Sequence, residues 1–417
     1  MSVLIRDALV KGAPQDVYIE EDRIVEIGAR PEADVVIDGR HKACLPGLVN
    51  GHTHAAMTLL RGYADDMRLR DWLERRIWPR EAKFEPEDVY WGTKLACLEM
   101  IRSGTTTFND MYFFMEEAAK AVTDMGLRAV LSYGIIDRFD AKTAESELKA
   151  TEGFLRFVRG LRNPRVQPAI GPHNMETVSE GTLASAKSLA IDEGVKVHFH
   201  LAETEAEVEA SRQRYGKGPV RALDAMGFLG DWLVAAHCVW LRGQDARVLG
   251  ERGVSAIHNP TSNMKLAVGR AFPYSDLQAA GVTIGLGTDG AASNDNLDLF
   301  EEIKLACLLQ KHATADPTVL PAGAAWTLAT QGGADALGLP TGRVEEGKLA
   351  DLILVDLRRA QLVPRHDLTS LLAYAANGSV VDTTICDGRV LMHEGHVAGE
   401  TEILEEGQAR ARALRER

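Results

Sequence analysis

The regular alternation of two kinds of segment in the central part of the chain most constrains its fold. Apolar, β-branched segments recur there, and helix-compatible stretches separate most of them. The segments lie at residues 44–54, 105–110, 129–137, 166–174, 195–203, 233–239, 254–260 and 282–290. One intervening stretch begins with Ser179, a candidate helix cap, and ends at Gly194. Eight strands that alternate with helices predict a (β/α)8 barrel, the TIM-like α/β fold.

The two ends of the chain follow a different pattern. Residues 1–45 alternate apolar and polar positions in "DVYIEEDRIVEI", which is typical of strands. Residues 345–400 do the same, with an Asp-Gly pair at 387–388 that is typical of a hairpin turn. We therefore expect a small β-sandwich formed by both ends, a catalytic barrel over 46–344, and a C-terminal helix over 401–417.

Charge and cysteine content narrow the class of protein. The chain has 417 residues, with 47 Lys and Arg against 60 Asp and Glu, which gives a net charge of -13. Such a field repels nucleic acid and anionic membranes, so a small molecule is the expected partner. The five cysteines form no CxxC pair, and "MSVLIRDALVKG" has no cleavable apolar segment. The longest uncharged run noted in the second half, 318–334, is a poor membrane span, so we expect a cytoplasmic enzyme.

Polar residues follow the apolar segments at the positions where a barrel places its chemistry. In this fold, catalytic groups come from the C-terminal ends of the strands and from the loops after them. The polar residues at these ends are His52, His54, Asn109, Asp110, Asp137, Arg138, His173, His200, Glu203, His237, His258 and Asp289. Their alignment predicts one site at one mouth of the barrel.

Four of these residues form a candidate metal site. His52 and His54 in "GLVNGHTHAAM" stand two positions apart, so on a strand they point to the same side. The pair alone fits ordinary strand residues equally well, and His198 could face inward as His200 does. Together with His200 and Asp289, the pair offers three imidazoles and a carboxylate, which suit Zn²⁺ or Fe²⁺. No lysine follows a central strand where it could bridge two ions, which favours one metal.

Three of the same residues are candidates for catalysis. Glu203 follows His200 by three positions, so a turn after the strand can bring its carboxylate back over the mouth as a general acid or base. Asp289 could hold an attacking water, and His237 could orient that water and stabilise charge. Glu203 could then protonate a ring nitrogen or a leaving group of the substrate.

Longer motifs resemble a known superfamily. They are "PGLVNGHTH", "SGTTTFNDM", "HLAETEAEV", "AAHCVWL", "IHNPTSNMKLAVG" and "GLGTDGAASNDNLDLFEEIKLA". Over roughly residues 1–400 the chain resembles the amidohydrolase superfamily, in particular its branch of 5-methylthioadenosine/S-adenosylhomocysteine deaminases and archaeal 5'-deoxyadenosine deaminases. The resemblance implies a barrel with a β-sandwich from both termini, and a homo-oligomer.

The resemblance also implies an activity. One divalent metal, in the first place Zn²⁺ with Fe²⁺ as the alternative, would be held by His52, His54, His200 and Asp289. Hydrolytic deamination at C6 of a 5'-modified adenosine would give the inosine derivative and ammonia. The substrates implied are 5'-deoxyadenosine, 5-methylthioadenosine, S-adenosylhomocysteine and adenosine itself. Glu203 would handle the proton at the purine N1, and the histidine at position 237 would assist the water.

Substrate-binding residues also come from the resemblance. Glu81 in "IWPREAKF" would bind ribose hydroxyls through charge-assisted hydrogen bonds, although it could equally be an acidic residue ahead of a helix. His173 in "GPHNMETVS" matches the substrate histidine of the branch. Residues 174–176 depart from the more usual "GPHAPYTCS", which leaves the preferred 5'-substituent open.

Arg138 and the wider class of activity remain open at this stage. Arg138 is a candidate contact for the ribose or the 5'-group, but it could instead pair with Asp137 or Asp140 on the surface. The alternative enzyme is a guanine, pterin or triazine hydrolase on the same scaffold, because function resides in the site and not in the fold. A non-catalytic metalloprotein is disfavoured, because the acid/base candidates are all present.

Overall fold

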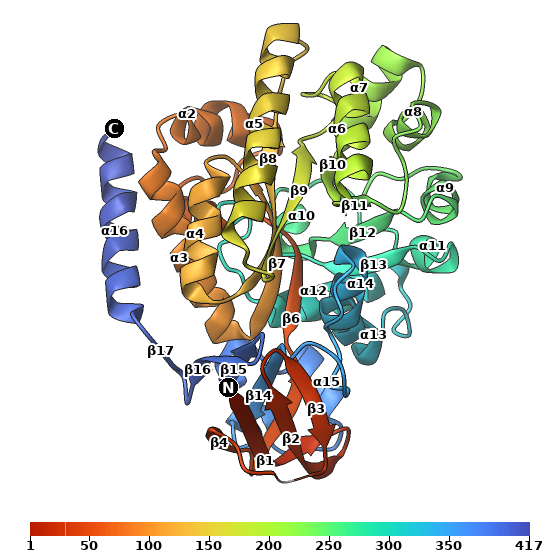
Figure 1. Cartoon of the computed structure of the whole chain (residues 1–417). Coiled ribbons are helices and arrows are strands. Elements are labelled where there is room, and N and C mark those ends of the chain that lie inside the picture. The colour runs from red at the N-terminus through yellow and green to blue at the C-terminus, as the bar shows by residue number, and fades with distance from the viewer. Residues whose placement is uncertain (30) are drawn as a thin grey trace.

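The centre of the protein is a parallel barrel. The computed structural model describes residues 1–29 and 31–417. The barrel strands are β6 (Leu48–Thr53), β7 (Thr105–Tyr112), β8 (Arg128–Ile135), β9 (Val166–Pro172), β10 (Val197–Leu201), β11 (Leu233–His237), β12 (Ser255–His258) and β13 (Thr283–Leu286). They pair in chain order, each parallel to the next (Figure 1). The predicted TIM-like barrel is confirmed.

Side chains close the seam between the first and last barrel strands. The Asn50 amide donates to Thr288 Oγ1 at 2.7 Å and accepts from the Thr288 backbone N–H at 3.1 Å, as a backbone group would. Next to it, the Asp289 N–H donates to the His52 carbonyl at 3.0 Å. A Cβ at Gly287 would lie 2.8 Å from the His52 nitrogen, so only glycine permits this approach. The seam therefore places His52 beside Asp289.

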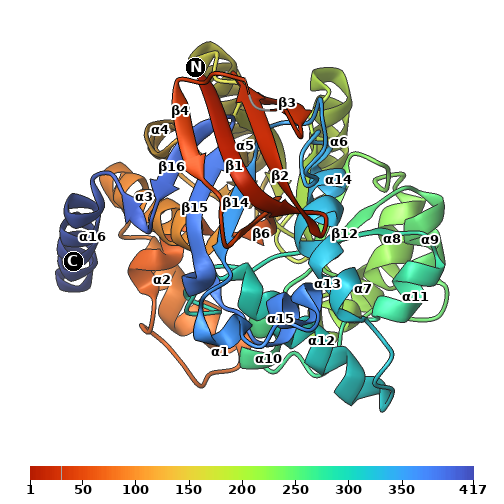
Figure 2. The same cartoon turned by 90° about the horizontal axis from the view of Figure 1, so that it is seen from below.

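Helices surround the barrel (Figures 1 and 2). They are α3 (Pro86–Ser103), α4 (Met115–Met125), α5 (Ala141–Leu161), α6 (Glu180–Glu193), α7 (Glu205–Tyr215), α8 (Pro219–Ala225), α9 (Asp245–Glu251), α10 (Pro260–Lys265), α11 (Tyr274–Ala279), α12 (Leu299–Thr314), α13 (Ala322–Thr327) and α14 (Gly333–Leu337). The predicted cap is present, since the Ser179 side chain accepts from the Thr182 N–H at the start of α6. In the described part of the chain, no helix is long and apolar enough to cross a bilayer.

A short helical segment precedes α3. It consists of η1 (Ala55–Leu60), α1 (Leu69–Trp72), the π-helix η2 (Leu73–Ile77) and α2 (Trp78–Glu81). At the other end of the chain, α16 (Glu400–Glu416) packs beside α3. The Arg417 guanidinium donates to both carboxylate oxygens of Asp88 at 2.9 and 2.8 Å, which ties the end of the chain to the start of α3.

Both ends of the chain form a second sheet below the barrel (Figures 1 and 2). Its strands are β1 (Ser2–Val10), β2 (Ala13–Glu20), β3 (Arg23–Ile27), β4 (Val35–Asp38), β5 (Lys42–Pro46), β14 (Leu352–Asp356), β15 (Val381–Cys386), β16 (Arg389–His393) and β17 (His396–Val397). The two halves join where β5 pairs antiparallel with β14. The C-terminal half also contains helix α15 (Leu368–Tyr374). The expected union of the two chain ends is confirmed.

Four charged residues, three of them buried and Asp387 mostly so, bind this sheet to the lower end of the barrel, and we call them the floor cluster: Arg128, Arg165, Asp351 and Asp387. Arg128 starts β8, and its guanidinium lies 2.9 Å from Asp351 Oδ2 and 2.7 Å from Asp387 Oδ1. Arg165 reaches the second oxygen of Asp387 at 3.2 Å. Removing one member of a buried pair leaves an uncompensated charge, so loss of either arginine would destabilise the junction between sheet and barrel.

Candidate active site

The four predicted ligand residues meet at the C-terminal end of the barrel. His52 lies on β6, His54 directly follows it, His200 lies on β10, and Asp289 follows β13. The Nε2 atoms of His52 and His54 each lie 3.3 Å from Asp289 Oδ1. The Nε2 atoms of His54 and His200 are also 3.3 Å apart. Four residues from three places in the chain thus direct their donor atoms at one point.

Hydrogen bonds on the far side of two rings fix which nitrogen is free. His54 Nδ1 donates to the Met111 carbonyl at 2.7 Å, and His200 Nδ1 donates to the His173 carbonyl at 3.0 Å. Because a carbonyl only accepts, each Nδ1 carries a hydrogen, and in the neutral ring each Nε2 then presents a bare lone pair. Two bare lone pairs at contact distance repel each other unless a cation lies between them.

The donor set fits a divalent cation. His52 Nε2 is buried and has no hydrogen-bond partner among the described residues. Donor atoms of His52, His54 and His200 lie within 4.8 Å of one another, and so do those of His52, His237 and Asp289. Burial lowers the pKa of His200 well below its ordinary value, so the ring is neutral, which is the form that binds metal. Three neutral imidazoles and a carboxylate suit zinc.

The loops after β12 and β13 hold Asp289 in place. Ser262 on α10 donates to Asp289 Oδ2 at 2.6 Å, and the Gly290 N–H donates to Oδ1 at 2.8 Å. The backbone of Asp289 is left-handed, with φ of 62°, a conformation that aspartate tolerates better than most residues. Both carboxylate oxygens are therefore anchored beside the histidines.

Glu203 follows β10 and lines the cavity above the histidines. Burial raises its pKa well above the ordinary value, and the nearby carboxylates of Asp289 and Glu207 raise it further. A protonated carboxyl at neutral pH is a general acid. Glu207 on α7 accepts from the N–H groups of Ala202 at 2.8 Å and Glu203 at 2.7 Å, and so positions the backbone of Glu203. We did not single out Glu207 from the sequence, although its Thr204-x-x-Glu207 spacing is that of a helix capping box.

His237 stands at the end of β11, with Nδ1 at 3.8 Å from Glu203 Oε1. Burial lowers its pKa to about 3, so the ring is neutral. The side-chain amides of Asn263 and Asn259 contact Nδ1 at 3.0 and 3.4 Å. Both asparagines belong to the motif after the seventh barrel strand, and only the fold brings them to this ring.

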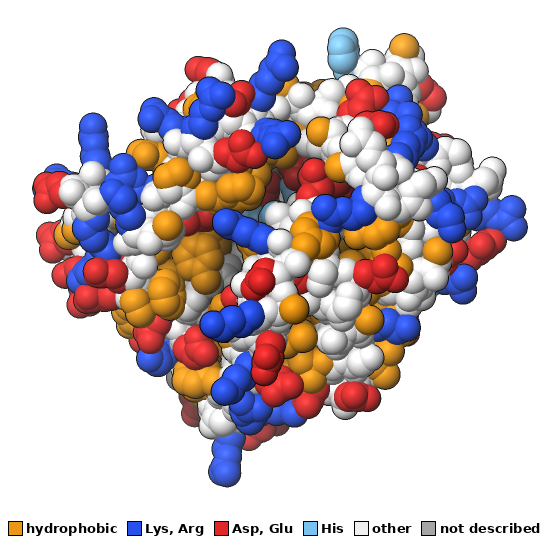
Figure 3. Space-filling model, turned by 90° about the horizontal axis from the view of Figure 1, so that it is seen from above, with side chains coloured by type: hydrophobic (Ala, Val, Ile, Leu, Met, Phe, Trp, Pro, Cys, Tyr) orange, Lys and Arg blue, Asp and Glu red, His pale blue; other side chains and the backbone are white. Residues whose placement is uncertain are grey.

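A cavity opens above these groups, in the hollowed upper face shown in Figure 3. Its apolar lining is Met57, Leu69, Trp72, Leu73, Trp78, Met111, Phe113, Ile136 and Leu266. The segment before α3 supplies several of these side chains and covers one side of the cavity. The wall of the cavity is therefore mostly apolar, and the histidines and carboxyl groups lie at its base.

Two of the three predicted substrate contacts outside the metal cluster line the cavity. Glu81 on α2 accepts from the Tyr112 hydroxyl at 2.7 Å, and burial raises its pKa. The ring of His173 is held by Thr177 Oγ1, which lies 2.8 Å from Nδ1. Arg138, by contrast, is exposed and does not line the cavity. Neighbouring Asp137 instead holds Ser179, the cap residue of α6, by accepting from Ser179 Oγ at 2.7 Å.

Two further strand-end histidines lie in different settings. His258 points away from the metal ligands and stacks on Phe272 at 4.5 Å between ring centroids. Neither of its nitrogens has a hydrogen-bond partner in the part of the chain that the structure describes. His198 lies beside the cluster instead, with Nε2 at 2.7 Å from Nδ1 of His52. Only His198 therefore contacts a candidate ligand.

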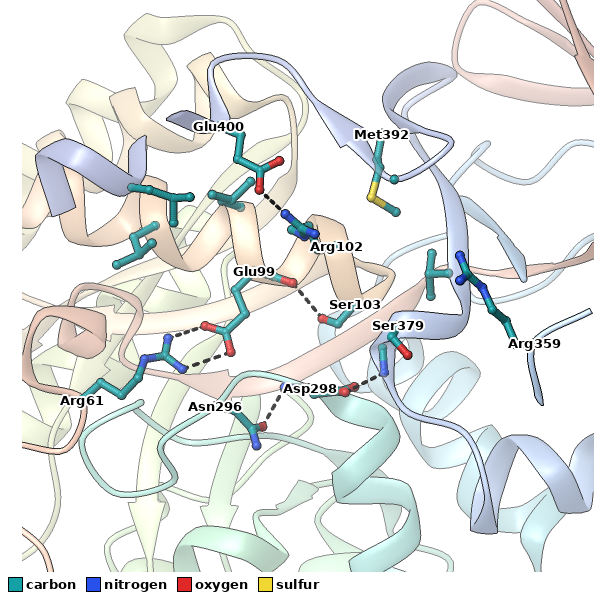
Figure 4. A pocket seen from close by; sticks show the side chains of 16 residues that line it. Arg61, Glu99, Arg102, Ser103, Asn296, Asp298, Arg359, Ser379, Met392 and Glu400 are labelled. Carbon is teal, nitrogen blue, oxygen red and sulfur yellow. Dashed lines mark hydrogen bonds and ion pairs between the residues drawn. The ribbon is translucent and has the colours of Figure 1, made fainter. Parts of the chain in front are cut away.

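A wider groove of about 700 Å³ lies elsewhere, between α3, α16 and the chain around β15. Figure 4 shows that its charged side chains face one another, with Arg61 paired to Glu99 and Arg102 to Glu400. None of the predicted site residues lines this groove. The wider groove therefore holds none of the candidate catalytic residues, which line the cavity above the histidines instead.

Known proteins resemble this chain over nearly its whole length. It is 51% identical to a 5'-deoxyadenosine deaminase of Methanoregula boonei over 99% of this chain and 95% of that protein. It is 47% identical to 5-methylthioadenosine/S-adenosylhomocysteine deaminase 1 of Archaeoglobus fulgidus, over 96% of each. A crystal structure of an adenosine deaminase from Xanthomonas campestris with bound zinc superposes with a TM-score of 0.94 at 35% identity, covering 100% of this chain and 99% of that one.

The sequence profile described as the amidohydrolase family matches residues 43–391, which include every residue of the histidine and carboxylate cluster. Relatives above 45% identity cover almost the whole chain, which confirms the resemblance to the amidohydrolase superfamily that the motifs indicate. The chain belongs to the amidohydrolase family.

Proposed function

We propose that this protein hydrolyses the 6-amino group of 5'-modified adenosines, 5'-deoxyadenosine among them, to give the inosine derivative and ammonia. The observation that carries this proposal is one cavity with a ligand-ready histidine cluster at its base and two buried carboxyl groups, Glu203 and Glu81, in its wall. The names of the relatives, 5'-deoxyadenosine deaminase and 5-methylthioadenosine/S-adenosylhomocysteine deaminase, support the substrate class.

The proposed cofactor is one divalent metal held by His52, His54, His200 and Asp289. Bound there, it would lower the pKa of a water molecule to about 7, which would supply a nucleophile at neutral pH. Zinc is the proposed ion because the donors are imidazole nitrogens and a carboxylate, and because the Xanthomonas protein binds it. Iron(II) is the other ion that this donor set accepts.

Proton transfer falls to Glu203. Its raised pKa keeps the carboxyl protonated, so it can donate to the purine N1 while water adds to C6. The resulting carboxylate then accepts one proton of the added water and passes it to the departing amino group, which leaves as ammonia, and the second proton of the water restores the protonated Glu203. His237 and Asp289 flank the same point and orient the water by hydrogen bonding. Glu203 thus serves first as acid and then as base.

Glu81 is the proposed ribose contact. It lies in the cavity wall with its carboxylate already aligned by Tyr112, and it can accept hydrogen bonds from vicinal hydroxyls. The remaining wall is apolar, and among the described residues that line the cavity none is Lys or Arg. An apolar wall accommodates a 5'-methyl or 5'-methylthio group more readily than the charged end of S-adenosylhomocysteine.

The test is ammonia release by the zinc-loaded protein from 5'-deoxyadenosine, 5-methylthioadenosine, S-adenosylhomocysteine, adenosine and guanine. The first two substrates should have the highest kcat/KM. A large preference for guanine, a pterin or a triazine would contradict the proposal and favour the alternative hydrolases.

The Glu81→Gln variant tests the ribose contact. A lost charge-assisted hydrogen bond should lower kcat/KM for nucleosides by about 10- to 100-fold, while the metal content stays unchanged. Glu85→Gln, an exposed change four residues further on, is the matched control. Normal turnover of 5'-deoxyadenosine by Glu81→Gln would rule out the ribose assignment.

A further inference from the structure

The three imidazoles of the cluster are held in two different ways. His54 and His200 donate their Nδ1 hydrogens to backbone carbonyls. Among the described residues, no carbonyl accepts from His52 Nδ1, which faces another ring instead, with His198 Nε2 at 2.7 Å. A carbonyl can only accept, whereas a neutral imidazole can donate or accept at this nitrogen. The tautomer of His52 therefore depends on that of His198.

The surroundings of His198 settle the direction of these hydrogen bonds. Ser132 on β8 donates its hydroxyl hydrogen to the Asp110 carbonyl at 2.7 Å. The Ser132 oxygen is then free to accept, and it lies 3.4 Å from His198 Nδ1. With the hydrogen on Nδ1, His198 presents a bare Nε2 to His52. His52 must then donate from Nδ1, which leaves its own Nε2 bare toward the other ligands.

The other tautomer of His52 would block the site. Its hydrogen would stand on Nε2 and point at Asp289 Oδ1, only 3.3 Å away, where it could form an internal hydrogen bond. Such a bond would occupy a ligand nitrogen and a ligand oxygen at once. Because His52 and His198 are both buried, with at most 1% of their surface exposed, water cannot supply an alternative partner.

We propose that His198 is a positioning residue for the metal site: held by Ser132, it keeps His52 in the tautomer whose Nε2 can bind a metal. The inference rests on the proposed metal site but not on the proposed substrate. Its test therefore measures metal binding instead of turnover. Partners of this kind, behind a ligand, typically change metal affinity by 10- to 100-fold.

The experiment compares zinc affinity of the apoproteins by competition with a chromophoric chelator. His198→Met fills a similar volume with only a weak acceptor and should bind zinc about 10- to 100-fold more weakly. His198→Gln can accept from His52 through its carbonyl oxygen and should recover most of the affinity. His258→Met, the same change at a buried histidine outside the cluster, should bind zinc as the unaltered protein does.

Ser132→Ala removes the anchor without changing either ring and should weaken zinc binding less than His198→Met does. The visible spectrum of the Co²⁺-loaded proteins adds a second readout, because a misplaced His52 alters the ligand field. Zinc affinity unchanged in both His198→Met and Ser132→Ala would overturn the inference, and so would a loss in His198→Gln as large as in His198→Met. If His198→Met does not fold, the zinc affinities of Ser132→Ala and His198→Gln are compared with that of the unaltered protein. Unchanged affinity in Ser132→Ala, or a loss of about 10- to 100-fold in His198→Gln, would then overturn the inference. Zinc binding without deamination would refute the proposed function alone.

Discussion

The two ends of the barrel differ in how their buried polar and charged groups are paired. At the floor, the carboxylates of Asp351 and Asp387 are neutralised by Arg128 and Arg165. At the mouth, polar atoms such as Asp110 Oδ2 and Asn109 Oδ1 are buried and lack a hydrogen-bond partner among the described residues. The same strands connect both ends. The carboxylates at the floor are thus paired with arginines, whereas Asp289 at the mouth lies against the rings of His52 and His54.

The carboxyl groups near the mouth of the barrel have raised pKa values. Burial raises the pKa of Asp110 to about 6, of Glu207 to about 7 and of Glu302 to about 8. Glu302 on α12 accepts from Asn294 and from the N–H of Thr261, and so joins the loops that carry Ser262 and Asp289. The mouth thus concentrates carboxyl groups that hold protons near neutral pH, which is typical of functional sites.

The largest expected effect is at the mouth. Glu203→Gln keeps the size and removes the transferable proton, so kcat should fall by about 10²- to 10⁴-fold. Thermal stability should be unchanged or higher, because a buried ionisable group is lost, and zinc content should stay at the level of the unaltered protein. Activity within a few-fold of normal would remove Glu203 from the mechanism.

At the floor, Arg128→Met should act on stability alone. It leaves two buried carboxylates without their strongest partner, at a cost of about 3–5 kcal/mol in the free energy of unfolding. The control is Arg247→Met, which breaks an exposed i,i+4 pair with Glu251 and should cost at most about 0.5 kcal/mol. Urea unfolding measures both, and equal losses would contradict the role of the floor cluster.

Removing the metal should lower the free energy of unfolding independently of the floor cluster. Zinc at 100 times its dissociation constant should add about 2.7 kcal/mol to the free energy of unfolding, because the unfolded chain has no assembled site. The same increment is expected in Arg128→Met, since distant sites act additively. A zinc increment that vanishes in this variant would mean that the floor and the mouth are coupled.

The last prediction concerns the dependence of stability on pH. Glu302 binds its proton more tightly in the folded state, where its pKa is about 8, than at its ordinary value of 4.5. Its stabilising contribution is therefore complete below pH 4.5 and is lost as the pH rises through about 8, at roughly 1.4 kcal/mol per unit of pKa difference. Glu302→Gln should flatten the fall in apoprotein stability between pH 5 and 8, and exposed Glu301→Gln should not. An unchanged slope would contradict the assignment.

Sequence patterns predicted the parts of the site that lie on strand ends. His52, His54, His200 and Asp289 could be placed together because parallel strands end at one face of a barrel. The resemblance added Glu81, whose segment before α3 has no such rule to position it. His54, His200, Asp289 and Glu81 line one cavity in the structure, and buried His52 lies against Asp289.

Loop geometry and side-chain contacts could not be predicted in this way. Arg138 follows a strand end like the others, but its backbone turns left-handed, with φ of 49°, and its N–H bonds to the Thr177 carbonyl, while the side chain is exposed. Glu207 and Asn263 act on catalytic candidates through contacts that only the packed loops create. The link from Ser132 through His198 to His52 joins three strands and has no counterpart in local sequence.

The most direct test of the account is a zinc titration of the metal-stripped protein, with ammonia release from 5'-deoxyadenosine as the readout. A single catalytic metal site predicts no turnover without metal and a linear rise that ends at one zinc per chain, with no rise in His52→Asn. Full activity in the stripped protein, or a rise that ends at two zinc ions per chain, would contradict it.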